Sequence, residues 1–284
     1  MIAPVFLSAS EPNPNRRKEY TLTANVVNLR EAVRAFCAHV LPNFPLVFGG
    51  HPAITPFVRV AADRIAHDLK DDPEFAAKAR LKAPQVVMFQ SRLFFDREAA
   101  PDELLTPPLD RDGNEEKPRN GWRNESLLLM RYEMLGYPVA PQSVDKAVQP
   151  YADTFGHKRE ARLGTREFSA AVFIGGMEGV QREFHIFRSF HPATPAFPIV
   201  STGSACKALF DEVQGLLRRS FVASLENETA YSLLMQQILP LSESPAVMVG
   251  WRRAPVPFRG EQHRDPEDIN VRFIDGALQK KRAL

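Results

Sequence analysis

Cysteine is scarce in this chain of 284 residues, which contains only Cys37 and Cys206. Both fall in stretches whose apolar residues recur at helical intervals. Small secreted folds that depend on disulfides carry many cysteines, and cysteine zinc sites need several close together. We therefore expect neither a disulfide framework nor a cysteine zinc site.

Long hydrophobic runs and an excess of one charge are also missing. No segment approaches the roughly 18 consecutive apolar residues of a membrane-spanning helix. The formal net charge is only +2, and the 36 basic residues are scattered, so a dedicated nucleic-acid face is not expected. The first residues lack the basic segment of a signal peptide. We expect a cytoplasmic protein that binds no membrane.

Several motifs that indicate a specific chemistry are absent as well. The histidines show no metal-ligand spacing such as His-x-x-x-His, and no metal or cofactor is predicted. The Gly-x-Ser-x-Gly elbow and the Gly-x-x-x-x-Gly-Lys phosphate loop do not occur. The stretch Gly175–Gly179 departs from the Gly-x-Gly-x-x-Gly fingerprint, which argues against an ordinary dehydrogenase.

Apolar periodicity is present and alternates between strand-like and helical stretches. Buried strands are predicted at Pro4–Ala9, Leu46–Phe48, Gln85–Gln90, Ser169–Ile174 and Phe197–Val200. Helices are predicted at Val26–Val40, from about Thr55, at Asn124–Leu135, at Glu178–Phe187, after Ser204, and from about Glu226 to Leu239. This alternation indicates an α/β fold, a Rossmann-like, doubly wound and mainly parallel sheet with helices on both faces.

Two regions lack this periodicity. Ala99–Asn120 is rich in proline and charge, and we predict a long exposed loop there. Beyond Gly250 the chain is basic and poorly periodic. We predict a single domain over residues 1–250 with a loop insertion at about 99–120, followed by a C-terminal extension at 251–284.

Small residues follow four of the predicted strands. They are Ser8-Ala9-Ser10, Gly49-Gly50-His51, Gly175-Gly176-Met177 and Ser201-Thr202-Gly203-Ser204. The carboxyl ends of parallel strands share one edge of a sheet, where open α/β folds bind their ligands. Glycine and serine are common in any strand-to-helix turn, but four such turns together favour a ligand site at this edge.

The turn at Gly175–Gly179 is the most informative of the four. Glycines at such a turn let backbone N–H groups approach an anion. Glu183, four residues beyond Gly179, could bind ribose hydroxyls or polarise water for attack on an anomeric carbon. Glu178 is nearer the glycines and is an alternative. A solvated carboxylate that complements the helix dipole would also account for Glu183.

A third cluster spans Gly121–Arg131, where Trp122 and Arg123 precede an apolar run. An arginine at a helix N-terminus could clamp a phosphate through two hydrogen bonds. Alternatively, Arg123 lies at the surface and Trp122 anchors the preceding loop.

These segments together resemble the SLOG superfamily, a Rossmann-like group. It includes the lonely-guy phosphoribohydrolases, the DNA-processing protein DprA and the ligand-sensing domain of TRPM channels. The chain is most similar to a bacterial subfamily found beside defence and conflict genes. The resemblance rests on Phe6–Ser10, Leu46–Pro56, Gly121–Ser126 and Phe173–Glu183, and with the helix after Ser204 it covers about three quarters of the chain.

The resemblance implies a nucleotide-binding domain. In the lonely-guy enzymes a Gly-Gly-x-Gly-Thr-x-x-Glu motif binds a nucleoside monophosphate, and its glutamate, with an upstream arginine, assists cleavage of the N-glycosidic bond. Laid onto this chain, the pattern implies Glu183 and Arg123 as the catalytic residues. The predicted ligand-binding residues are Ser8, Ser10, Gly49, Gly50, His51, Glu125, Gly175, Gly176, Met177, Glu178, Gly179, Thr202 and Gly203.

The chain departs from that motif in ways that bear on its function. One extra residue separates the glycine pair from Gly179, and Val180 stands where the threonine would be, which removes a hydrogen bond worth ~1 kcal/mol. A basic pair expected after the upstream arginine is also absent. These departures favour binding over catalysis.

Three functions remain open from the sequence. The first is a domain that binds a nucleotide or NAD-derived second messenger, and the second is an N-glycosidase that uses the same pocket. The third is an interaction module in which Ala99–Asn120 and the arginine-rich tail contact a protein or single-stranded DNA. By family habit a homodimer is expected, and an effector protein is a candidate partner.

Overall fold

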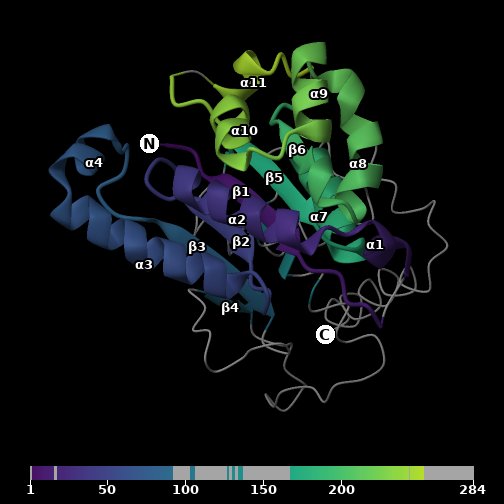
Figure 1. The fold of residues 1–284 in the computed structure, drawn as a ribbon, viewed down its shortest axis with the longest axis horizontal. Helices are drawn as coiled ribbons and strands as arrows, with labels where there is room; N and C mark the ends of the chain where they lie inside the picture. Colours follow the sequence, from purple (N-terminus) through teal and green to yellow (C-terminus); the bar gives the residue numbers. More distant parts are fainter. Residues whose placement is uncertain are drawn as a thin grey trace, which may run out of the picture.

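The computed structural model describes residues 2–15, 18–91, 103–105, 127, 130, 131, 134–136, 167–242 and 244–252. Within them, six parallel strands form one sheet in the order β4-β3-β2-β1-β5-β6, with helices packed against it (Figure 1). The predicted α/β, Rossmann-like fold is confirmed. None of the described helices is long and apolar enough to cross a membrane.

Five of the six strands lie close to the predicted ones. The strands are β1 (Val5–Ser10), β2 (Leu46–Gly49), β3 (Val86–Ser91), β4 (Glu103–Leu105), β5 (Ala170–Gly175) and β6 (Ala196–Ile199). The sixth, β4, falls inside the predicted loop Ala99–Asn120, so that prediction is wrong there. A strand of three residues is too short to show a period, and it is defined by its parallel pairing with β3.

The longer helices also match the prediction, whereas most of the short ones were not foreseen. The helices of both kinds are α1 (Lys18–Thr23), α2 (Val26–Val40), α3 (Thr55–Asp71), α4 (Pro73–Lys78), α7 (Glu178–Phe190), α8 (Ala205–Val213), α9 (Arg219–Asn227), α10 (Tyr231–Ile238) and α11 (Pro245–Met248). Two turns of 3-10 helix, η3 (Val200–Thr202) and η4 (Gln214–Leu216), flank α8. Cys37 in α2 and Cys206 in α8 are buried free thiols.

One predicted helix is wrong. The stretch from Glu226 to Leu239 is not continuous, because the chain turns between α9 and α10. At this turn the Glu228 carboxylate accepts a hydrogen bond from the Ala230 N–H at 2.7 Å. A side chain that satisfies the backbone locally in this way competes with helix propagation.

The core lies between the sheet and the helices that cover it. In Figure 1, α2 and α3 lie in front of the strands, and α2 also packs against α10. Phe6 in β1 stacks on Phe187 in α7, with ring centroids 5.8 Å apart. Since side chains alternate along a strand, Ser8 points to the same face as Phe6 and therefore also toward α7.

The strand order reverses between β1 and β5. From β1 the sheet continues through β2, β3 and β4 on one side, and through β5 and β6 on the other. Open α/β sheets bind ligands in the crevice outside the carboxyl ends of the strands at such a reversal. Here those ends bring Ser10 and Gly175 into register as neighbours.

Candidate functional site

Glu183 lies beside the carboxyl-terminal half of β1 and is held by two buried side chains. The Ser8 hydroxyl donates to Glu183 Oε2 at 2.6 Å, and Arg131 Nε donates to Oε1 at 3.1 Å. The side chains of Arg131 and Glu183 are only 8% and 13% exposed. A buried charge requires a partner, and here each of the two ions compensates the other.

The position of Glu183 follows from the pattern of α7. Val180, Phe184 and Phe187 are buried residues of this helix, and Phe184 and Phe187 pack against Phe173 in β5. Glu183 is three residues from Val180 and four from Phe187, so it lies on the same face of the helix. The alternative of a solvated carboxylate therefore does not apply to Glu183. It is Glu183, and not Glu178, that meets Ser8 and Arg131.

Among the described residues, the arginine that contacts Glu183 is Arg131. Arg123 and Glu125 lie outside the described residues, so their predicted roles stay predictions. Arg131, in the same sequence cluster, is helical and buried. A signal for it was present, because Arg131 follows Leu127 by four residues and adjoins Met130, which places a cation within an apolar helical stripe.

The two adjacent glycines form the turn from β5 into α7. Gly175 and Gly176 have φ of +62° and +83°, which glycine adopts without strain. The Gly175 N–H donates to Thr202 Oγ1 at 2.9 Å, and the Gly176 N–H donates to the Ser10 carbonyl at 2.8 Å. Both N–H groups are thus used inside the protein in this structure.

The N-terminus of α7 offers backbone donors that no described residue accepts from. Met177 precedes the helix, and its side chain makes no capping hydrogen bond. No described residue accepts a hydrogen bond from the N–H of Met177 or of Gly179. A Cβ added at Gly179 would lie 3.1 Å from Arg131 Nη2, so the absent side chain is what lets the guanidinium approach this turn. An uncapped helix N-terminus beside a guanidinium is suited to an anion.

Thr202 and Gly203 follow β6 and contact the end of β5 and the end of α1. Thr202 is fully buried, and its hydroxyl accepts from Gly175 and donates to the Ile199 carbonyl at 2.6 Å. Gly203 has a φ of +71°, and a Cβ there would lie 1.8 Å from the Thr23 carbonyl oxygen. These residues hold the junction between α1 and α2 against η3.

Gly49, Gly50 and His51 lie further along the same edge, at the end of β2. The Gly50 N–H donates to the Phe89 carbonyl at 2.7 Å. His51 is half-buried, and its Nδ1 accepts from the Ala53 N–H at 3.2 Å. Burial lowers the pKa of His51, partly opposed by the charge of Glu11. No hydrogen bond or ion pair between described residues joins His51 to Glu183.

Tyr20 is part of this region although the sequence analysis did not single it out. Its hydroxyl donates to Gln181 Oε1 at 2.9 Å, and its carbonyl accepts from Ser204 Oγ at 3.1 Å. The short helix α1 is thereby tied to the first turns of α7. The sequence around it is polar and rich in proline, and a helix of six residues leaves little periodic signal.

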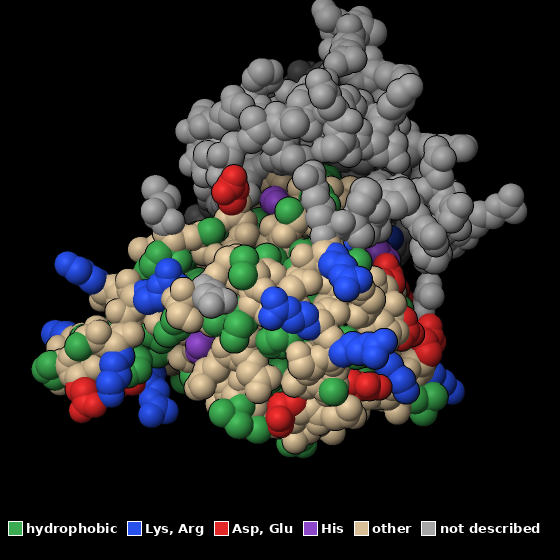
Figure 2. Space-filling model, turned by 90° about the horizontal axis from the view of Figure 1, so that it is seen from above, with side chains coloured by type: hydrophobic (Ala, Val, Ile, Leu, Met, Phe, Trp, Pro, Cys, Tyr) green, Lys and Arg blue, Asp and Glu red, His purple; other side chains and the backbone are tan. Residues whose placement is uncertain are grey.

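The charges of the described residues bear on the other functions that the sequence left open. On the face shown in Figure 2, basic and acidic side chains are interspersed and do not form one basic field. Within the described ranges, no group of three or more His, Cys, Asp or Glu residues is placed to hold a metal ion. The segments assigned to an interaction module lie almost entirely outside the described residues.

Comparison with known families gives a match over most of the chain. The model of the SLOG cluster3 family matches residues 19–148 and 142–239. No curated protein matches the chain, and neither does any solved structure. The matched residues include Arg131, Glu183 and the whole of α7.

Proposed function

The chain belongs to the SLOG cluster3 family, a family of nucleotide-related Rossmann-like modules, and we propose that it binds a nucleotide or NAD-derived small molecule at the crevice between β1 and β5. We further propose that it senses such a signal in a bacterial conflict system, as a cytoplasmic homodimer that passes the signal to an effector protein. The family resemblance supports this wider role, and the geometry supports the binding site.

The observation that carries the proposal is the orientation of Arg131. Its Nε is occupied by Glu183, whereas its Nη2 lies beside Gly179 at the uncapped start of α7. A phosphate placed there would accept hydrogen bonds from the guanidinium and from the Met177 and Gly179 N–H groups. It would also be stabilised by the positive end of the helix dipole.

Glu183 would serve this site in two ways. It fixes the guanidinium, and the remaining lone pairs of its carboxylate can accept hydrogen bonds from ribose hydroxyls. Both carboxylate oxygens already accept a hydrogen bond from a protein donor, and Val180 supplies no hydroxyl to a phosphate. These features support retention of a ligand more than its turnover.

The second candidate is an N-glycosidase that uses the same crevice. It is supported by the burial of a carboxylate beside the proposed phosphate position, where Glu183 would stabilise an oxocarbenium-like state or activate water. Binding and cleavage are distinguished by what happens to the nucleotide.

The test is mass spectrometry of small molecules after incubation of the full chain with NAD, ADP-ribose and its cyclic isomers, nucleoside monophosphates and cyclic oligonucleotides. Free and protein-retained fractions are compared for the wild type, Glu183→Gln and Arg131→Gln. We expect one intact nucleotide in the retained fraction, reduced at least about tenfold in both variants, which corresponds to a loss of about 1.4 kcal/mol.

The matched control is Glu31→Gln, which removes an exposed carboxylate that also pairs with an arginine, Arg34. It should retain the nucleotide as the wild type does. Release of a free base or ribose phosphate that stops with Glu183→Gln would establish the glycosidase instead. Unchanged retention in both buried-pair variants, with folding verified by circular dichroism, would remove this crevice from the function.

A further inference from the structure

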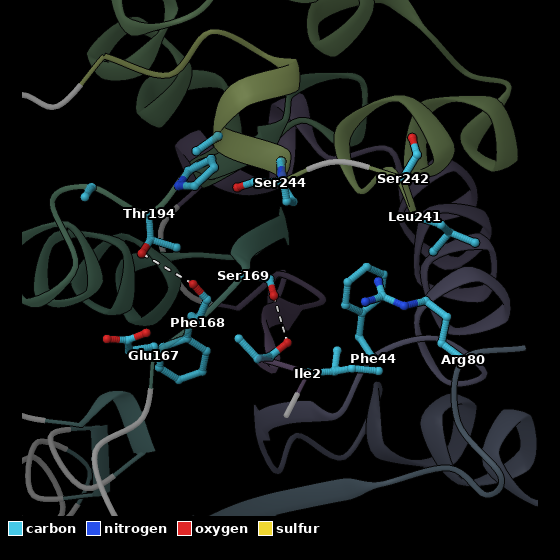
Figure 3. Close-up of a pocket in the computed structure, with 15 residues that line it drawn as sticks. Ile2, Phe44, Arg80, Glu167, Phe168, Ser169, Thr194, Leu241, Ser242 and Ser244 are labelled. Atoms are coloured by element: carbon cyan, nitrogen blue, oxygen red, sulfur yellow. Dashed lines mark hydrogen bonds between the residues drawn. The ribbon is translucent and has the colours of Figure 1, made fainter.

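A cavity lies at the edge of the sheet opposite the proposed nucleotide site, by the amino-terminal ends of the strands (Figure 3). Its volume is about 570 Å³, within the range of small-molecule sites. Residues just before β1, β2, β5 and β6 line it, together with the connection between α10 and α11. The proposed nucleotide crevice contributes no residue to it.

Arg80 is an exposed cation that lines this cavity, and it has a backbone hydrogen bond and an aromatic contact to the core. Its N–H donates to the Pro42 carbonyl at 3.1 Å, and its guanidinium carbon lies 5.1 Å from the centroid of the Phe44 ring. Phe44 is only 2% exposed, so the ring is fixed by the core. Guanidinium stacking on an aromatic ring leaves the in-plane N–H donors free for a bidentate partner.

Arg80 has no carboxylate partner in the described part of the chain. A close comparison is Arg34, whose guanidinium lies the same 5.1 Å from the centroid of the Phe57 ring but pairs with Glu31. Ordering a long side chain costs conformational entropy. An ordered guanidinium that faces a cavity without a counter-ion is suited to capture an anionic group from outside.

The other walls of the cavity carry groups of complementary character. Ser242 and Ser244 come from the connection between α10 and α11, and Ser244 precedes α11 without capping it by its side chain. Neither hydroxyl has a hydrogen-bond partner among the described residues. Glu167 lies across the cavity from Arg80 (Figure 3) and forms no ion pair with a described residue. Phe44 and Leu241 add apolar surface.

We propose that this cavity binds a short peptide with free termini. The terminal carboxylate pairs with the two free edges of the Arg80 guanidinium, and the terminal ammonium lies toward Glu167. The peptide amides between them exchange hydrogen bonds with the Ser242 and Ser244 hydroxyls, while apolar side chains lie against Phe44 and Leu241. Such a peptide has a negative end, polar amides in the middle and a positive end, and the walls of the cavity present the complementary groups in the same order.

The probe is an equimolar library of tripeptides with free termini, incubated with the full chain and read by mass spectrometry of the retained fraction. The wild type should retain a subset of the library. Arg80→Gln should reduce that retention at least about tenfold through loss of the bidentate pair. The enriched tripeptide is then titrated by calorimetry as the free acid, as the C-terminal amide and in N-acetylated form.

The amide should bind the wild type at least about tenfold more weakly than the free acid, and it should show no further loss with Arg80→Gln. The N-acetylated form should lose affinity for the wild type but not for Glu167→Gln. The control Arg34→Gln, which removes another stacked arginine, should bind as the wild type does. Nucleotide retention should be unchanged in Arg80→Gln, so that failure at either site is seen separately.

Three results would overturn the proposal. The first is a wild type that retains no tripeptide above the level of Arg80→Gln. The second is binding that is equal for the free acid and the amide. The third is benzoate competing as strongly as the tripeptide, which would make the cavity a site for simple organic acids.

Discussion

At the scale of single residues, the proposed nucleotide site depends on the close approach of the Arg131 guanidinium to Gly179. Gly179 leaves room for Arg131 Nη2 at the first turn of α7, and Glu183 holds the same guanidinium by its Nε. The third glycine of the turn is therefore explained by a side chain that packs against it. Gly176 is explained similarly, since a Cβ there would lie 2.2 Å from Val180 Cγ2.

We expect Gly179→Ala to weaken nucleotide retention several-fold. The added methyl group would lie 3.1 Å from Arg131 Nη2, so the guanidinium must shift away from the start of α7. Thermal stability should change little, because alanine favours a helix over glycine by up to about 1 kcal/mol and offsets the crowding. The measurement is the binding isotherm of the retained nucleotide.

Gly215→Ala is the matched control, because a Cβ at Gly215 has no neighbour within 4 Å. It should bind nucleotide as the wild type does. Equal binding by Gly179→Ala and the wild type would show that the position of Arg131 does not matter for the ligand.

At the scale of elements, the junction with η3 fixes the position of α1 and of the start of α2. Gly203 and Ser204 both have positive φ, and Ser204 Oγ donates to the Tyr20 carbonyl. The Asn25 N–H donates to the Thr202 carbonyl at 3.2 Å, which ties the start of α2 to the same place. The turn after β6 thus positions the two helices that follow β1.

Gly203→Ala should lower the free energy of unfolding by more than about 2 kcal/mol. Its Cβ would lie 1.8 Å from the Thr23 carbonyl oxygen, a backbone atom that can move only if the end of α1 moves. Urea unfolding followed by circular dichroism measures the loss. Hydrogen exchange should show earlier opening of α1.

Gly250→Ala separates the clash from the effect of positive φ. Gly250 has a φ of +61°, but the nearest atoms to a Cβ there belong to the side chain of Arg218, and not to the backbone as at Gly203. Gly250→Ala should lower the free energy of unfolding clearly less than Gly203→Ala does. Equal losses of unfolding free energy would mean that the positive φ alone, and not the close contact with the end of α1, explains why residue 203 is glycine.

At the scale of the whole molecule, the half-buried His39 connects distant parts of the chain. His39 in α2 contacts the Leu239 carbonyl just after α10 through its Nε2 at 2.7 Å. Burial lowers the pKa of His39, partly opposed by this hydrogen bond, and burial likewise lowers the pKa of His51. Between the lowered pKa and the ordinary value of about 6.5, the unfolded chain binds more protons than the folded one.

Stability should therefore be fully present above about pH 6.5 and should fall as the pH drops below that value. The test is the free energy of unfolding in urea from about pH 7.5 to about pH 5.5 for the wild type and His39→Gln. The variant keeps a donor for the Leu239 carbonyl but cannot titrate, so its curve should be flatter. Parallel curves for the two proteins would exclude His39 as a source of the pH dependence.

The sequence by itself determined the parallel sheet, its strand-end glycines and Glu183 as a residue of interest. The periodicity of apolar residues indicates which face of a helix or strand is buried, and glycine and serine clusters indicate where strands end. Only the tertiary structure decided the partners of Glu183, because Ser8 and Arg131 are 175 and 52 residues away and meet it through strand register and helix packing. The same holds for the Gly175 N–H, which is bound by Thr202 from another strand end. Local pattern carries no information on such distant pairings, so the sequence did not indicate Arg131 as the partner of Glu183. The predicted role of Arg123, which lies outside the described residues, stays a prediction.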